Sequence, residues 1–219
     1  MTHAYNESYL NDAMNNLGDM FDYAVRVLGY NGDKFMEYFL SSGVAHKFET
    51  ANPKYIAGMS GIELCERVLQ ATQPDQKLLA PEQREFDGVE FWVGWILAYY
   101  QWESNLSFSQ IVSCGLTYSK IESLYILHEA DTSKFTETAN KIIMRRRETS
   151  PTNLQTIRKS RGYTQKKLSD ESGVNLRMIQ LYEQRKNDIN KASISVVSSL
   201  AKALGCLSDD LMETVPNTI

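Results

Sequence analysis

Apolar residues in the first forty positions recur at the three- and four-residue spacing of a helix. This spacing predicts one helix over residues 9–28, ending at Gly29, and a second around residues 35–40, ending at Gly43. The apolar positions are Leu10, Met14, Leu17, Phe21, Ala24, Val25, Leu28, Phe35, Met36, Phe39 and Leu40.

Residues 50–59 interrupt this helical pattern. We expect them to be irregular, because Pro53 disfavours the helical conformation in the residue before it. Ser60 and Glu63 have the spacing of a capping box, in which each side chain bonds to the backbone of the other. A helix over residues 61–70 should therefore begin after Ser60.

Residues 82–103 are apolar on nearly every side of a helix. Because such a helix is normally buried, we expect it to be the centre of an N-terminal domain. Rings at this spacing would also suit a pocket for a small effector, and the sequence leaves open whether residues 86–102 are core or pocket. The aromatic residues are Phe86, Phe91, Trp92, Trp95, Tyr99, Tyr100 and Trp102.

Shorter apolar stretches follow this helix. We expect a short helix around residues 108–113, and a second capping box of Ser119 and Glu122 should open a helix that runs to Leu127.

A last helix should be capped by Asp131 or Thr132 and should end before Ser150-Pro151-Thr152. Its end carries the arginines 145–147, which we interpret as solubilising and helix-dipole residues. A non-specific phosphate contact is the alternative.

The stretch from Thr164 onward combines a helix, a tight turn and a second helix. Thr164 is a good N-cap for a helix over residues 165–172, and Gly173 suits a turn that needs a positive φ. Val174 and Ile179 would anchor the turn and the second helix. These features predict a helix-turn-helix. Its open face would carry Asn175, Leu176, Arg177 and Gln180.

Residues 153–213 resemble the Cro/repressor-type (XRE-family) DNA-binding domain. IRKSRGYTQKKLSDESGV is similar to the first two helices of that family, NLRMIQLYEQRK to its recognition helix, and ISVVSSLAKALGCLSDDLME to its last two helices. The resemblance implies a five-helix, lambda-repressor-like bundle with a structural ion pair between Arg158 and Glu183. One departure is that Gln184-Arg185-Lys186 replaces the usual glycine after the recognition helix.

We expect the open face of the recognition helix to read double-stranded DNA in the major groove. Arg177 could bridge guanine O6 and N7, Asn175 and Gln180 could pair with adenine, and Leu176 could contact a thymine methyl. Phosphate contacts are expected from Gln165, Lys166, Arg185, Lys186, Asn187 and Lys191. The alternative for each Lys or Arg is simple solubility.

Charge divides the chain in the same way as the motifs. The chain has a net charge of −4, but residues 141–219 hold 14 Lys+Arg and 8 Asp+Glu, a net charge of +6, which leaves −10 for residues 1–140. We therefore expect an all-α protein with a helical partner or effector domain over residues 1–149 and the DNA-binding domain over residues 150–219. Because one module grips half a site, we expect a homodimer on a palindromic operator.

The N-terminal region resembles a bacterial family that joins such a region to a Cro/repressor-type domain. The segments that carry the resemblance are GMSGIEL, FWVGWILAYYQW and LHEADTSKF. The resemblance implies an autoregulating antitoxin that binds a protein toxin through residues 1–140. The alternatives are an effector-sensing or phage-type repressor and an enzyme fused to a DNA-targeting module.

Other functional classes lack their motifs. Ser60 does not have the spacing of a nucleophile elbow, and His128-Glu129 lacks the second histidine of a zinc site, so we expect no catalytic residue, metal or cofactor. Cys65, Cys114 and Cys206 are widely spaced, which predicts reduced thiols in a cytoplasmic protein. The first ten residues do not resemble a signal peptide, and no apolar run is long enough for a membrane span.

Overall fold

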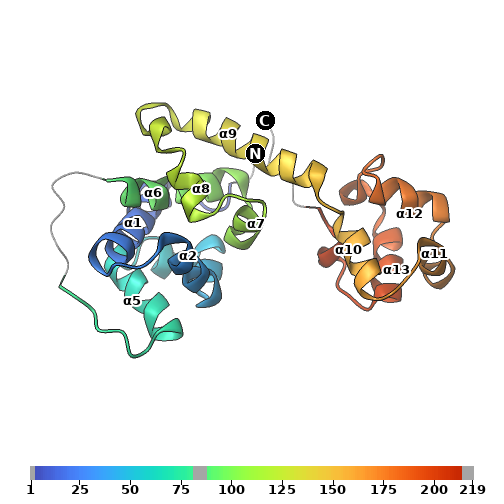
Figure 1. Cartoon of the computed structure of the whole chain (residues 1–219), viewed down its shortest axis with the longest axis horizontal. Coiled ribbons are helices and arrows are strands. Elements are labelled where there is room, and N and C mark those ends of the chain that lie inside the picture. The colour runs from blue at the N-terminus through green and yellow to red at the C-terminus, as the bar shows by residue number, and fades with distance from the viewer. Residues whose placement is uncertain (1–2, 81–87, 214–219) are drawn as a thin grey trace. The chain divides into compact units, whose positions relative to one another are not determined.

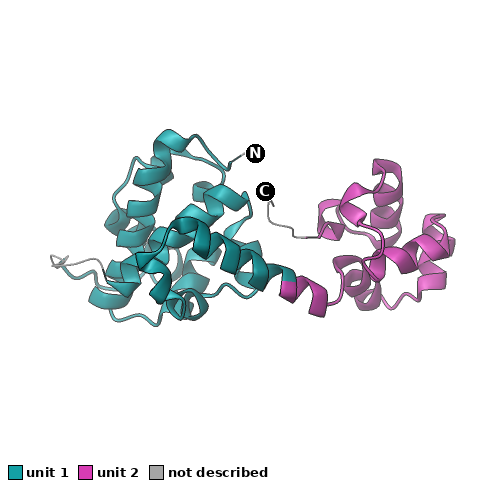
Figure 2. Cartoon of the chain, turned by 90° about the horizontal axis from the view of Figure 1, so that it is seen from above, with its two compact units in different colours: residues 1–144, 216–219 teal, residues 145–215 magenta. Residues whose placement is uncertain are grey.

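The chain is described by a computed structural model that covers residues 3–80 and 88–213. Within these ranges every regular element is helical, which confirms the predicted all-α class. The helices form two compact units, residues 1–144 and residues 145–215 (Figures 1 and 2). The division falls inside one helix, a few residues before the break predicted at Ser150-Pro151.

The first unit begins with a single 3-10 turn, η1 (Glu7–Tyr9), followed by α1 (Leu10–Asp22). The predicted helix over residues 9–28 continues past α1 as the π-helical turn η2 (Tyr23–Val27). The second helix, α2 (Gly32–Ser41), begins at the Asn31 cap, whose side chain accepts a hydrogen bond from the Lys34 amide.

Two short helices occupy the segment before Ser60. They are α3 (Val44–Glu49) and α4 (Pro53–Ile56). Because α4 lies within residues 50–59, the expectation that these residues are irregular is wrong. Pro53 is the first residue of α4, where a proline needs no amide hydrogen, and Asn52 caps that helix. The capping box at Ser60 is confirmed, and it opens α5 (Gly61–Thr72).

Helix α6 (Val89–Ser104) packs along α1 at the centre of the first unit, as Figure 1 shows. Glycine permits the close approach of the two helices. A Cβ atom at Gly94 would overlap the carbonyl of Leu17, and one at Gly18 would overlap the ring of Phe91. The predicted start of this helix at Glu82, with Phe86, lies outside the described residues.

The rings of α6 are part of the core. Trp92 packs edge-on against Tyr125 and Phe135, and Tyr100, which is fully buried, also contacts Phe135. The indole of Trp102 stacks on His3 with ring centroids 3.8 Å apart, and its Nε1 donates to the Tyr5 carbonyl at 2.8 Å. These contacts favour the interpretation of α6 as a core helix.

Three helices and a 3-10 turn complete the first unit. They are α7 (Phe108–Ser113), α8 (Tyr118–Glu122), η3 (Tyr125–Glu129) and α9 (Thr132–Thr149). The capping box predicted at Ser119 is wrong. Helix α8 starts earlier, because the Thr117 hydroxyl accepts a hydrogen bond from the Lys120 amide. At α9, the Asp131 side chain accepts a hydrogen bond from the Ser133 amide.

Over its described residues, 145–213, the second unit contains the last turn and a half of α9 and six further elements. These are α10 (Asn153–Ser160), α11 (Gln165–Ser172), α12 (Leu176–Glu183), η4 (Ile189–Lys191), α13 (Ile194–Leu204) and η5 (Asp209–Leu211). The fifth helix of the expected bundle is therefore only a 3-10 turn. Leu168, Ile179, Leu200 and Leu211 are fully buried in a core separate from that of the first unit. Among the described helices, none is long and apolar enough to cross a bilayer.

Candidate nucleic-acid interface

Helices α11 and α12 are joined by a turn that is fixed by short-range hydrogen bonds. Gly173 ends α11 with a φ of 71°. The hydroxyl of Ser169 donates to the Val174 carbonyl at 2.8 Å, and the hydroxyl of Ser172 accepts from the Val174 amide at 3.2 Å. Val174 is itself buried, so the turn is stabilised both by hydrogen bonds and by burial of an apolar side chain.

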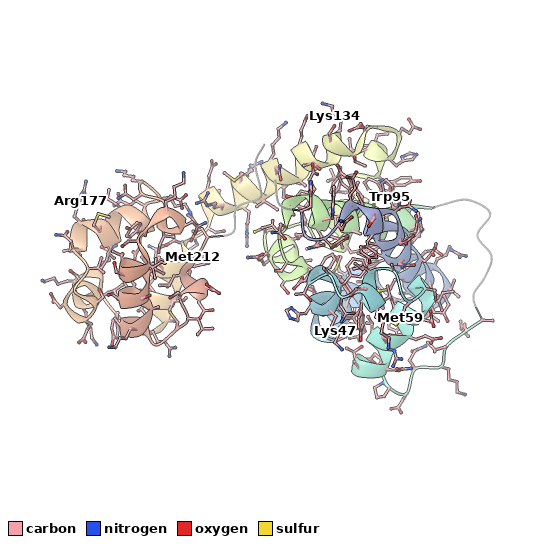
Figure 3. All side chains as sticks on the ribbon, turned by 180° about the vertical axis from the view of Figure 1, so that it is seen from behind. Lys47, Met59, Trp95, Lys134, Arg177 and Met212 are labelled. Carbon is pink, nitrogen blue, oxygen red and sulfur yellow. The ribbon has the colours of Figure 1, made fainter. Side chains whose placement is uncertain are left out.

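Helix α12 presents a polar outer side and an apolar inner side. Its residues Ile179 and Tyr182 are buried on the inner side. Arg177 is exposed and lies on the outer side of the helix in Figure 3. The four residues predicted to read bases lie together at the start of α12, with Asn175 and Arg177 exposed and Leu176 and Gln180 half-buried.

Asn175 has a structural task in addition to its predicted one. Its Oδ1 accepts a hydrogen bond from the Arg177 amide at 2.8 Å and thereby caps α12. The Nδ2 donor and the second lone pair of Oδ1 remain for a base edge. The cap also fixes the direction in which the first turn of α12 points.

A buried ion pair holds the opposite side of α12. Arg158 of α10 donates from Nε to Glu183 Oε1 at 2.5 Å and from Nη2 to Glu183 Oε2 at 2.9 Å. The same Oε2 accepts from Gln165 Nε2 at 2.8 Å, which links the first turn of α11 to the end of α12. These hydrogen bonds to Glu183 raise the pKa of Arg158.

The predicted phosphate contacts differ in how they are placed. Lys186 and Lys191 are exposed, whereas Lys166 is exposed but lies 2.7 Å from the carboxylate of Asp170. The Asn187 side chain is turned toward the Met178 sulfur at 3.8 Å. The Gln165 side chain is held by Glu183, so only its backbone amide, which has no partner inside α11, is suited to a phosphate.

Arg185 requires a correction, because its side chain serves the structure of the unit instead of the outer surface. Its guanidinium donates to the carbonyls of Ser150 at 2.7 Å and Pro151 at 3.3 Å, and to Glu213 Oε2 at 2.8 and 3.1 Å. Only 22% of the side chain is exposed. Four of the five N–H donors of Arg185 are therefore engaged within the unit, and the side chain is not directed toward a phosphate.

The loop after α12 explains why the missing glycine is tolerated. The Lys186 amide donates to the Leu181 carbonyl at 2.9 Å and the Arg185 amide to the Tyr182 carbonyl at 3.0 Å, which is the pattern of a Schellman motif. Arg185 occupies the left-handed position of that motif with a φ of 53°. The loop thus keeps the geometry that a glycine would give, with an arginine in its place.

Glu213 is a buried carboxylate that the sequence did not reveal. Besides Arg185, it binds the Asn153 amide through Oε1 at 2.8 Å, and the Arg147 Nε lies 3.7 Å from its Oε2. Of the arginines 145–147, Arg147 therefore faces this carboxylate and Asp188, whereas Arg145 and Arg146 are exposed. No local motif could have indicated these partners, because they lie 28 to 66 positions away from Glu213.

The arrangement suits recognition of duplex DNA. A helix whose exposed start carries Asn, Arg and Gln can enter a major groove and form hydrogen bonds with base edges. Among the described residues, no group of three or more His, Cys, Asp or Glu is placed to hold a metal ion.

Residues 154–211 match the family model described as helix-turn-helix. The matched region covers the second unit between α10 and η5 and none of the first unit. A search of curated proteins and a search of solved structures each gave no match. The chain thus carries an XRE-type helix-turn-helix DNA-binding domain, which supports a role as a DNA-binding transcription regulator.

Proposed function

We propose that the protein is a sequence-specific transcriptional repressor that binds a palindromic operator as a homodimer. One observation carries this proposal: α12 exposes Arg177 on its outer side while the buried pair of Arg158 and Glu183 holds its inner side. A base-reading helix needs both features, because contacts to base edges are specific only when the helix has a fixed direction.

Arg177 would provide the most discriminating contact, a bidentate pair with guanine, worth about 1–3 kcal/mol against a wrong base. Asn175 and Gln180 would read neighbouring bases and Leu176 a thymine methyl. Lys186, Lys191 and the start of α11 would bind phosphates and set the register of the helix in the groove. Two copies related by a two-fold axis would place two such helices one helical turn of DNA apart, about 34–36 Å.

For the first unit we propose the role of an antitoxin module that binds a protein toxin and works in the cytoplasm. Two observations support it: residues 1–140 carry a net charge of −10, and the helices of residues 3–144 enclose their own core. Complementary charge speeds the association of a basic partner with such a module.

The alternatives receive less support from the described residues. An effector pocket built on α6 would need rings that line a cavity, and those of Trp92, Tyr100 and Trp102 are packed against other side chains. An enzyme built on Ser60 would need a free hydroxyl, and this one exchanges hydrogen bonds with Glu63 as a helix cap.

Selection of binding sites from random duplex DNA with the full-length protein tests the repressor proposal. The expected product is a palindrome whose half-sites are about 10 base pairs apart, protected in a footprint by a complex of two chains. Failure to enrich any sequence at low salt, where phosphate contacts are strongest, would exclude the proposal.

The antitoxin role is tested by co-expressing the full chain with the product of the neighbouring gene. A complex that survives purification and neutralises the toxicity of that product is expected. Thermal stabilisation by a metabolite, with no protein complex, would instead favour the effector-sensing repressor.

A further inference from the structure

Glu213 joins four separate segments of the second unit, three through its carboxylate and one through its backbone. It binds the guanidinium of Arg185 after α12 and the Asn153 amide at the start of α10. Arg147, from the last turns of α9, lies within ion-pair distance, and the backbone of Glu213 exchanges hydrogen bonds with the Asn190 side chain of η4 at 2.8 Å. We call these five residues the Glu213 cluster.

The conformation of Arg185 indicates that its side chain matters. A left-handed φ is strained in a residue with a Cβ atom, whereas glycine adopts it freely. The Schellman position after α12 therefore favours glycine, yet it holds an arginine with a φ of 53°. The four hydrogen bonds of its guanidinium offset this strain, since hydrogen bonds to a charged group are stronger than those between neutral groups.

The cluster reaches beyond the helix-turn-helix region on both sides. The family match begins at residue 154 and ends at residue 211. Arg147 and Asn153 of the cluster precede it, and Glu213 follows it. The guanidinium of Arg185 binds the carbonyls of Ser150 and Pro151, so the segment that leads into α10 is held against the loop that follows the recognition helix.

We propose that Arg185 is a positioning residue for DNA binding that acts through the Glu213 cluster. It ties residues 147–151 to the C-terminal end of α12 and thereby fixes the loop that presents Lys186 to the phosphates. This inference rests on the proposed DNA-binding function. It assigns to residues 147–151 and Glu213 a part in the DNA-binding unit that the helix-turn-helix region alone does not include.

The substitution Arg185→Gly separates the two properties of this residue. Glycine keeps, and even eases, the left-handed backbone of the loop, but it removes all four side-chain hydrogen bonds. Arg185→Lys keeps the charge without the planar fork that reaches two carbonyls and a carboxylate together. Glu213→Gln keeps the shape of the acceptor and removes its charge. Lys202→Ala, at an exposed position on α13, is the matched control for the loss of one positive charge.

Two measurements on the full-length protein test whether Arg185 positions this loop for DNA binding. Hydrogen exchange at the amides of residues 146–153, apart from Pro151, needs no DNA. We expect it to accelerate about tenfold or more in Arg185→Gly, Arg185→Lys and Glu213→Gln, and not at all in Lys202→Ala. Exchange at the α13 amides should stay at the wild-type rate, which shows that the unit remains folded. Operator affinity should fall about tenfold in the same three variants, and the salt dependence should decrease because Lys186 is no longer held in place.

Wild-type exchange rates at residues 146–153 in Arg185→Gly and Glu213→Gln would overturn the inference, and so would unchanged operator affinity in both variants. If Arg185→Gly fails to fold, the isosteric Glu213→Gln gives the decisive result. If the wild-type protein selects no DNA at all, the proposed function fails, while the exchange measurement still shows whether Arg185 holds the segment.

Discussion

The side chains of Arg158 and Glu183 form a buried ion pair with two parallel hydrogen bonds, of 2.5 and 2.9 Å, between α10 and the last residue of α12. The side chains are only 8% and 2% exposed, so each charge depends on the other for compensation. This pair connects the core of the second unit to the helix proposed to read DNA.

Replacing Arg158 by Met should destabilise the second unit by about 3–5 kcal/mol, because Glu183 would remain buried without its cationic partner. The double variant Arg158→Met/Glu183→Leu should lose less of its free energy of unfolding than the single variant, since no uncompensated charge remains. Urea titration followed by far-UV circular dichroism measures the loss. All three tryptophans lie in α6, so tryptophan fluorescence follows the first unit separately and should not change. A single-variant cost below about 1 kcal/mol would show that the pair contributes little.

Arg177→Ala should relax operator specificity at one base pair in each half-site. The expected loss of discrimination is about 1–3 kcal/mol, the value of one bidentate contact to guanine. Competitive mobility-shift titrations with single-base operator variants measure this loss. Unchanged discrimination at every position would show that Arg177 does not read a base.

Lys186→Ala is the matched comparison, because it removes one exposed positive charge from the same surface without removing a base contact. It should weaken binding to all sequences by a similar factor and reduce the slope of log affinity against log salt by about one unit. A change in the preferred sequence would instead assign Lys186 to base reading.

Gly94→Ala should destabilise the first unit by about 3 kcal/mol or more, because the new methyl group would overlap the backbone of Leu17 across the contact of α1 with α6. Gly29→Ala is the control. It meets open space at a φ of 73°, so it should cost only the backbone strain of about 1–2 kcal/mol. Tryptophan fluorescence during urea titration measures the free energy of unfolding of both variants. An equal loss in the two would contradict the close packing at Gly94.

Burial raises the pKa of the Cys65 thiol to about 12, so a thiol reagent at pH 8 should modify Cys65 only when the first unit unfolds. In the unfolded chain the thiol has a pKa near 8.5. The preference for the neutral thiol in the folded state thus stabilises the unit fully below about pH 8.5, and this contribution is lost as the pH rises toward 12.

Burial raises the pKa of Tyr5, Tyr100 and Tyr118 as well. These phenols therefore also lower the stability of the first unit as the pH rises in alkaline solution. Comparison with Cys65→Ala separates the thiol from the phenols. The wild-type protein should lose more of its free energy of unfolding between pH 8 and pH 11 than this variant does. Parallel curves would show that the thiol has no part in the alkaline loss.

Local patterns were sufficient for much of the secondary structure. The capping box of Ser60 and Glu63 was readable because both partners lie within four positions and fix one turn. Thr117 was missed because Ser119 and Glu122 offered an equally good local pattern, and tertiary contacts decided between them. The Ser119 amide binds Asp33 Oδ1 at 3.1 Å, a contact with α2 that no local pattern contains.

The candidate DNA-binding surface was predictable where residue type and helical position determine exposure, as for Arg177 and Lys186. It was not predictable for Arg185, whose charge suggested a phosphate contact. Its partners Ser150, Pro151 and Glu213 lie 28 to 35 positions away, and only the folded unit brings them together. Sequence shows which side chains could bind DNA, whereas the fold decides which of them are already engaged.

The contact of Gly94 with Leu17 has a consequence for the order in which the protein is made. The two residues are 77 positions apart, so α1 leaves the ribosome long before the helix that covers its apolar side. Until α6 has been synthesised, Leu17 lacks the helix that packs against it. Ribosome-bound chains shorter than about 104 residues should therefore be substrates for chaperones and proteases. The apolar side of α1 becomes protected from them only when α6 packs against it.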